Sequence, residues 1–196
     1  MRRKLTQRGK ERRLQLMEHA AKLFTERGYH PTSVSDIVET LGVGKGVFYW
    51  YFSSKEELLA EILREAHQDL RRRQQQAIVD EPNPVVRIEL GIRATIDWFL
   101  EHRKYFTLFQ FAASDERFAP VLRRNHDVAI ADSMRHIKEA IVDGLIADQN
   151  PEMLAEAIFG TINQLTRAYV FERSEPVQRT ADATVSFCLH GLVGGD

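Results

Sequence analysis

The chain has 196 residues, of which 43% are apolar and 28% charged, and this composition excludes an intrinsically disordered protein because it supplies enough apolar surface for a core. A single cysteine, Cys188, excludes an internal disulfide, and no apolar run approaches the length of a membrane span. The net charge of −1 conceals an asymmetry, because residues 1–60 carry eleven Lys and Arg against seven Asp and Glu.

The first 60 residues are therefore basic, and the rest of the chain is acidic. This division indicates a phosphate-binding domain attached to a domain that does not bind phosphate. The cations of the amino-terminal segment can reach the backbone or the minor groove of DNA, although a solvated arm that binds nothing is the alternative. No apolar stretch typical of a signal peptide follows, so we expect a cytoplasmic protein. The cations are Arg2, Arg3, Lys4, Arg8, Lys10, Arg12 and Arg13.

The first helix is predicted from about Gln7 or Gly9 to Arg27, and Gly28 ends it. Pro31 restricts the residue before it to an extended conformation, which separates this helix from the next. Apolar residues at helical spacing predict the buried stripe of the first helix. They are Leu14, Met17, Ala21 and Phe24.

Residues 32–41 are predicted to form a second, short helix. Ser33 has the N-cap position and Asp36 follows three residues later, in a place typical of a capping box. Gly42 ends this helix, and a third helix is predicted over residues 44–52. Two short helices joined by a tight turn with glycine indicate a helix-turn-helix, whose second helix enters the DNA major groove.

The third helix has more aromatic residues than so short a segment can bury. Phe48 and Phe52 lie four residues apart and are expected on its core side. An outward run of rings indicates a contact surface, although Tyr49 and Trp50 are alternatively core residues. The residues left for such a surface are Lys45, Val47, Tyr49, Trp50 and Tyr51.

A long fourth helix is predicted to begin near Ser53, because Ser53 and Glu56 have the Ser-x-x-Glu form of a capping box. Its polar stretch Arg71–Gln76 is interpreted as a solvated helix end rather than a nucleic-acid patch. Residues 80–84 contain two prolines and turn residues, and they form the clear break in the chain.

Residues 20–29, AAKLFTERGY, and residues 49–58, YWYFSSKEEL, carry two motifs at a fixed separation. They resemble the amino-terminal signature of the TetR family of bacterial transcriptional repressors. The position of Gly44 is usually serine in that family, so the third helix lacks a side-chain N-cap here. The resemblance implies an all-α fold, with a three-helix helix-turn-helix DNA-binding domain over residues 1–54. The long fourth helix joins it to a ligand-binding and dimerisation domain over residues 55–196.

The resemblance also implies a homodimeric repressor that binds a palindromic operator in double-stranded DNA and is released by a small-molecule effector. No catalytic activity, cofactor or membrane contact is implied. By match to the family motif, the DNA contacts are Ser33, Ser35, Lys45, Tyr49, Tyr51 and Lys55. Gly46, Val47 and Trp50 complete the predicted surface.

Beyond the break, the chain is predicted to be helical near residues 84–102, 104–114, 117–147, 151–173 and 177–193. No alternating run long enough for a sheet appears. The segment 84–102 is apolar nearly all round, so we expect it at the centre of a bundle.

Aromatic residues concentrate around the segment 104–114. Clustered rings are often plain core, but an effector site also needs an apolar cavity with a few polar anchors. A lining with few charges predicts a largely apolar effector, either a fatty acyl derivative or a lipophilic drug-like compound. For Arg93 the alternative is an exposed ridge with Glu89 and Asp97. The predicted lining is Trp98, Phe106, Phe109, Phe111 and Phe118, with Arg93, Gln110, Asn163 and Arg167 as anchors.

The last two predicted helices have more apolar surface than one small bundle covers, which predicts a two-fold interface. Small residues would let the paired helices approach closely. The alternative is that both helices are absorbed within one subunit. The predicted interface residues are Ala157, Gly160, Thr161, Gln164, Ala168, Phe187 and Gly191.

Signatures of catalysis are weak, because the sequence has neither a phosphate-binding glycine loop after a strand nor a nucleophile elbow. Asp132, His136 and Glu139 share one helix face, but such a trio is usually a surface charge cluster, so no metal site is predicted. The alternatives are a metal-sensing regulator of the same fold and a helical binding protein without DNA function.

Overall fold

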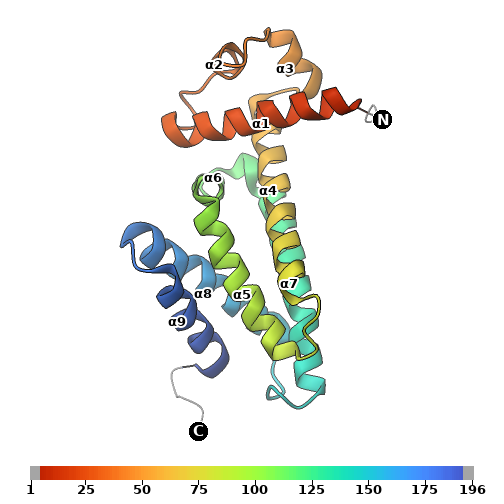
Figure 1. Ribbon diagram of the computed structural model, residues 1–196, viewed down its shortest axis with the longest axis vertical. Helices are drawn as coiled ribbons and strands as arrows, with labels where there is room; N and C mark the ends of the chain where they lie inside the picture. Colours follow the sequence, from red (N-terminus) through yellow and green to blue (C-terminus); the bar gives the residue numbers. More distant parts are fainter. Residues whose placement is uncertain (1–4, 192–196) are drawn as a thin grey trace. The chain divides into compact units, whose positions relative to one another are not determined.

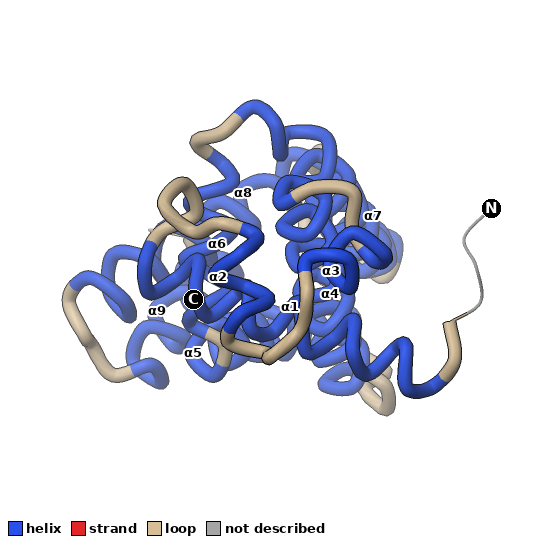
Figure 2. Tube along the Cα trace, turned by 90° about the horizontal axis from the view of Figure 1, so that it is seen from above, coloured by secondary structure: helices blue, strands red, loops and turns tan. Residues whose placement is uncertain are grey.

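The computed structural model describes residues 5–191, and within them it consists of helices and loops with no strand (Figures 1 and 2). The predicted all-α fold is therefore confirmed. The first four helices are α1 (Gln7–Arg27), α2 (Val34–Glu39), α3 (Lys45–Tyr51) and α4 (Lys55–Ile78). The remaining elements are α5 (Pro84–Glu101), α6 (Arg103–Ala113), the 3-10 turn η1 (Glu116–Phe118), α7 (Ala119–Val142), α8 (Pro151–Leu165), the π-helix η2 (Thr166–Glu172) and α9 (Val177–His190).

Two predicted helices differ most from the observed ones, while the last one, predicted over 177–193, ends at His190. The segment predicted over 117–147 ends at Val142, because the N–H groups of Leu145 and Ile146 turn back to the carbonyl of Ala140 and Gly144 adopts a φ of +69°. The segment predicted over 151–173 changes from an α-helix to a π-helix at Thr166. A hydrophobic pattern does not distinguish these two helix types, so the sequence could not predict the change.

The chain folds into two compact units. Unit 1 contains the chain up to His67 together with Arg103–Arg123, and unit 2 contains Gln68–His102 together with the chain from Arg124 onward. Helices α4 and α7 therefore each contribute residues to both units. The predicted limit of a DNA-binding domain at residue 54 stays a prediction.

The core of unit 1 joins α1, α2, α3 and α4 to residues from α6 and η1. Tyr29 lies at its centre, with ring centroids 5.1 Å from Phe24, 5.1 Å from Phe111 and 5.6 Å from Phe118. Leu108 of α6 is buried in the same core, and α6 packs against α1. The described residues up to His67 thus share one core with residues 103–123.

The buried stripe of α1 is only partly as predicted. Met17, Ala21 and Phe24 are buried, but Leu14 is 48% exposed, so its assignment to the core is wrong. Arg13 lies next to it and donates to Glu61 of α4 at 2.6 Å. Arg13 therefore takes the position that faces α4, and the next residue, Leu14, is left exposed.

Arg13 consequently does not belong to a free basic arm, and its guanidinium also lies 5.5 Å from the Phe52 ring centroid. Arg2, Arg3 and Lys4 lie outside the described residues. Thr6 caps α1 by accepting a hydrogen bond from the N–H of Gly9.

The core of unit 2 forms around α5, as its apolar pattern predicts. Ile88, Ile92 and Ile96 of α5 are buried, and α5 packs against both α8 and α9. These helices contribute the buried Ala155, Ile162, Ala181 and Val185 to the same cluster.

Phe118→Ala should lower the free energy of unfolding by about 3–5 kcal/mol, because a fully buried ring is replaced by a cavity beside Tyr29. Urea unfolding measured by circular dichroism checks this value. Tyr49→Ala, which truncates an exposed ring in the same unit, is the control and should change stability little. Equal effects of the two substitutions would contradict the shared core.

Candidate nucleic-acid interface

Helices α2 and α3 form the predicted helix-turn-helix. Ser33 caps α2 by accepting from the N–H of Asp36, whose carboxylate accepts from the N–H of Ser33 at 2.7 Å, so the predicted capping box is confirmed. Hydrogen bonds from Ser33 lower the pKa of the Asp36 carboxyl. Gly42 turns the chain with a φ of +63°, which glycine adopts without strain, and Gly44 caps α3 without a side-chain hydrogen bond.

Helix α3 presents two different faces. Phe48 and Phe52 are buried, as predicted, whereas Tyr49 is 56% and Trp50 54% exposed. The alternative that these two rings are core residues is therefore wrong. Lys45 and Gly46 are also exposed, and no heavy atom within 4 Å would meet a Cβ added at Gly46. The exposed side of α3 therefore has one cation, two aromatic rings and, at Gly46, backbone that no side chain covers.

The other predicted DNA contacts have partners within the unit or are partly buried. The Ser33 hydroxyl is engaged with Asp36, and Ser35 and Val47 are half-buried. Tyr51 is half-buried as well, with its ring centroid 4.5 Å from that of Trp50 and its side chain packed against the core of unit 1. Their contacts with DNA stay predictions.

The amino terminus of α4 is capped one residue later than predicted. The Ser54 hydroxyl accepts from the N–H of Glu57 at 3.1 Å, and the Glu57 carboxylate accepts from the N–H and hydroxyl of Ser53 at 2.6 Å. The pairing of Ser53 with Glu56 is therefore wrong. The Glu56 carboxylate instead accepts from Arg117.

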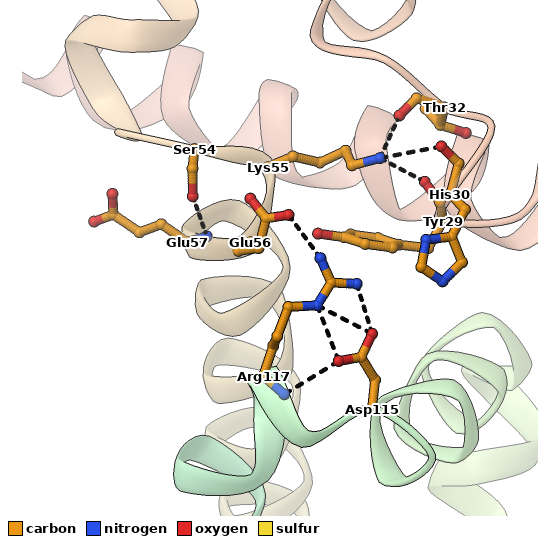
Figure 3. A network of polar contacts seen from close by, with 9 residues as sticks. All are labelled: Tyr29, His30, Thr32, Ser54, Lys55, Glu56, Glu57, Asp115 and Arg117. Carbon is orange, nitrogen blue, oxygen red and sulfur yellow. Dashed lines mark hydrogen bonds and ion pairs between the residues drawn. The ribbon is translucent and has the colours of Figure 1, made fainter.

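Lys55, the first residue of α4, points back toward the loop between α1 and α2 (Figure 3). Its ammonium donates to the carbonyl of Tyr29 at 2.8 Å, that of Thr32 at 2.8 Å and that of His30 at 3.4 Å. Burial lowers the pKa of this ammonium. The predicted contact of Lys55 with DNA is untested, but this geometry gives the cation other partners.

Arg117 also lies near Tyr29, and it forms one cluster with Tyr29, Lys55, Glu56 and Asp115 (Figure 3). Its guanidinium donates to Glu56 at 3.0 Å and to Asp115 at 2.6 Å, and it lies 5.4 Å from the Tyr29 ring centroid. Hydrogen bonds from Arg117 lower the pKa of the Asp115 carboxyl to about 2. Burial raises the pKa of the Tyr29 hydroxyl, and the nearby Glu56 carboxylate raises it further. This cluster was not predicted, because its members are up to 88 positions apart in the chain.

The predicted effector-binding residues fall in both units. Unit 1 contains Phe106, Phe109, Gln110, Phe111 and Phe118, and unit 2 contains Arg93, Trp98, Asn163 and Arg167. Phe111 and Phe118 pack around Tyr29, which is the core role considered as the alternative. Their role in binding a ligand stays a prediction.

The polar anchors in unit 2 each have a protein partner. Arg93 pairs with Glu89 at 2.9 Å, as the exposed-ridge alternative requires, and with Asp182 of α9 at 2.6 Å. Arg167 donates to Glu172 at 2.7 Å. The amide of Asn163 donates to the carbonyl one turn earlier in its own helix.

Trp98 is 1% exposed, and its indole N–H donates to Asp69 at 2.8 Å. This hydrogen bond lowers the pKa of the Asp69 carboxyl. Both residues belong to a polar hollow in unit 2 that the sequence did not predict, although the polar run at the end of α4 supplies part of it. The hollow is lined by Asp69, Arg72, Arg73, Gln76, Trp98, Glu101 and His102.

Two of the three residues considered as a metal site, Asp132 and Glu139, each pair with a different arginine. The carboxylate of Asp132 pairs with Arg71, and that of Glu139 pairs with Arg87. Burial lowers the pKa of the imidazole between them in the sequence, His136. Among residues 5–191, no three His, Cys, Asp or Glu side chains are arranged to hold a metal ion. In the same part of the chain, no helix is both long and apolar enough to cross a membrane.

Comparison with known proteins identifies the family. Residues 16–62 match the model of bacterial regulatory proteins of the tetR family. A Bacillus subtilis HTH-type transcriptional regulator, YdgC, is 25% identical over 189 residues, which cover 94% of each chain. The fatty acid metabolism regulator protein of Bacillus subtilis is 25% identical over 173 residues, which cover 80% of this chain and 82% of the relative.

A solved structure agrees with this assignment at the level of the fold. The fatty acid degradation regulator FadR from Bacillus halodurans has a TM-score of 0.87 and 17% identity, with 98% of this chain and 100% of that chain covered. The matched segment 16–62 contains α2 and α3, including the exposed rings of α3, and the likeness extends over both units. The chain therefore belongs to the TetR family of bacterial transcriptional regulators.

Proposed function

We propose that this protein is a repressor without catalytic activity, which binds a palindromic operator as a homodimer through α3. The observation that carries the proposal is the outward face of this helix. Tyr49 and Trp50 are more than half exposed, although burial of such rings is strongly favourable, and Lys45 adds a cation beside them. Aromatic and cationic side chains on a recognition helix are suited to base edges and phosphates.

Selection of bound duplexes from a random DNA pool by the purified protein tests the proposal. The expected product is a sequence with two inverted half-sites, because a two-fold dimer presents two copies of α3. Recovery of unrelated sequences would contradict operator binding. Recovery of a single half-site would contradict only the dimeric mode.

Tyr49→Ala should weaken binding to the selected duplex by about tenfold, since an exposed side chain of the reading helix is lost. Lys45→Ala should reduce the slope of log affinity against log salt by about one unit, since one phosphate contact is lost. Fluorescence anisotropy over a range of salt concentrations measures both effects. Circular dichroism should show unchanged helix content in both variants, because neither side chain belongs to the core.

Phe48→Ala is the contrasting variant, because this buried ring anchors α3. It should lose DNA binding together with stability, by about 3–5 kcal/mol. Normal DNA binding by Tyr49→Ala would show that the faces of α3 are wrongly assigned.

The proposal of a dimer is supported by exposed residues on α8 and α9. Met153, Ala157 and Gly160 of α8 are exposed at intervals of four and three residues, which places them on one face of the helix. Phe187 of α9 is 45% exposed. An exposed apolar face with small residues is suited to a self-complementary interface, in which two copies of each helix pack together.

Gly160→Leu should give a monomer that fails to bind the two-site duplex tightly. No heavy atom of the neighbouring elements lies within 4 Å of a Cβ added at Gly160, so a side chain at this exposed position begins in open space and is expected to act on the approach of a second copy. Sedimentation velocity at micromolar concentration measures the change. Ala77→Leu, which also adds a leucine at an exposed helical position, is the control and should remain dimeric. A monomeric unmodified protein would refute the dimer.

We further propose that the effector is largely apolar and is a fatty acyl derivative in preference to a drug-like compound. The name of the Bacillus subtilis relative that regulates fatty acid metabolism supports this choice. Arg167 is 41% exposed on the π-helix and is suited to hold a carboxylate or phosphate head group.

Long-chain acyl thioesters should displace the protein from the selected duplex, whereas lipophilic cations should not. Arg167→Ala should abolish displacement and preserve DNA binding, because only the anchor for the anionic head is removed. Arg179→Ala, which removes another exposed, paired arginine of unit 2, is the control. Displacement by lipophilic cations alone would favour a drug sensor, and displacement by a divalent metal alone would favour a metal sensor.

A further inference from the structure

Every donor of the Lys55 ammonium has a carbonyl acceptor inside unit 1. An ammonium has three protons, and three backbone carbonyls, those of Tyr29, His30 and Thr32, lie within hydrogen-bonding distance of this one. The Tyr29 ring centroid is 4.3 Å from the same nitrogen, so the cation also faces an aromatic surface. A direct hydrogen bond from this ammonium to a phosphate would have to replace one of these three bonds and leave that carbonyl without its present partner.

The three carbonyls belong to the loop that sets the position of α2. Thr32 is buried and its hydroxyl donates to the carbonyl of Gly28 at 2.7 Å, and the next residue, Ser33, is the N-cap of α2. Helix α2 in turn packs against α3. The loop is therefore linked through α2 to the helix that carries Tyr49 and Trp50.

We propose that Lys55 is a positioning residue for DNA reading, which fixes the Tyr29–Thr32 loop and contributes no phosphate contact. The inference rests on the proposed function, since the position of α3 matters to the protein only if α3 reads DNA. Under this proposal Lys55 does not contact DNA itself but holds the loop that positions α2, and through it α3.

Arg117 braces the same loop from the segment between α6 and α7. Its guanidinium lies near the Tyr29 ring, and Glu56 and Asp115 hold it there (Figure 3). Glu56 directly follows Lys55 at the start of α4, so the two cations and the ring form one connected cluster. The loop before α2 is thus held by residues from two separate stretches of the chain.

Lys55→Met and Lys45→Met form a matched pair for the test. Each lysine is the first residue of its helix, and methionine keeps an unbranched stem while it removes the three donors. Lys45 is exposed, whereas Lys55 faces the loop. Amide hydrogen exchange of residues 33–41 without DNA and affinity for the selected duplex at several salt concentrations are measured for each variant.

Lys55→Met should accelerate exchange across α2 and weaken duplex binding roughly tenfold at every salt concentration, with an unchanged salt slope. Lys45→Met should leave exchange unchanged and reduce the salt slope by about one unit. A reduced salt slope with unchanged exchange in Lys55→Met would overturn the proposal, because that result identifies a phosphate contact.

Arg117→Met extends the test to the second brace, with Arg123→Met as a control that removes an exposed arginine of the same unit. Only Arg117→Met should accelerate exchange across α2. If the unmodified protein bound no duplex, the proposed function would fail, but the exchange measurements would still decide whether Lys55 and Arg117 hold the loop. Unchanged exchange in Lys55→Met would overturn the proposal that Lys55 holds the loop, whatever the affinity of this variant for the duplex.

Discussion

The fold of unit 1 depends on the burial of Phe48 and Phe52 beneath α3. This helix has only seven residues, and successive side chains on a helix are about 100° apart, so burying Phe48 turns Tyr49 and Trp50 away from the core. A helix of this length is not stable by itself in water. The core of α1, α4, α6 and η1 therefore supplies the stability that allows two large rings to remain exposed.

Some cations of unit 1 are held by acceptors inside the unit, which limits the number that can contact DNA. The basic composition of the first 60 residues suggests many phosphate contacts, but Arg13 is committed to Glu61 and Lys55 to backbone carbonyls. Cations held this way pair with specific acceptors and stabilise the relative positions of α1, α2 and α4. The cations left for DNA are fewer and lie nearer the surface, and Lys45, Lys10 and Arg8 are exposed examples.

The sequence predicted most helix limits, because Gly28, Gly42, Pro31 and the prolines at 82 and 84 interrupt the chain at the right places. It could not decide between Ser53 with Glu56 and Ser54 with Glu57, since both pairs have the spacing of a capping box. The cluster around Tyr29 depends on tertiary contacts between distant residues, which no local pattern encodes. For the same reason, the sequence could not show that Phe111 and Phe118 pack in the core of unit 1, and their predicted role in binding a ligand stays a prediction.

The core shared by α1, α2, α3 and the start of α4 with residues 103–123 bears on how regulators of this kind can be recombined. The family match covers residues 16–62, and a chimera joined just after that segment would separate Phe24 and Tyr29 from Leu108 and Phe118. Such a hybrid would carry an unfilled core beneath α2 and α3 unless the recipient supplied side chains of matching shape. The exchangeable module is therefore discontinuous, and a graft into an unmatched recipient must transplant both stretches together.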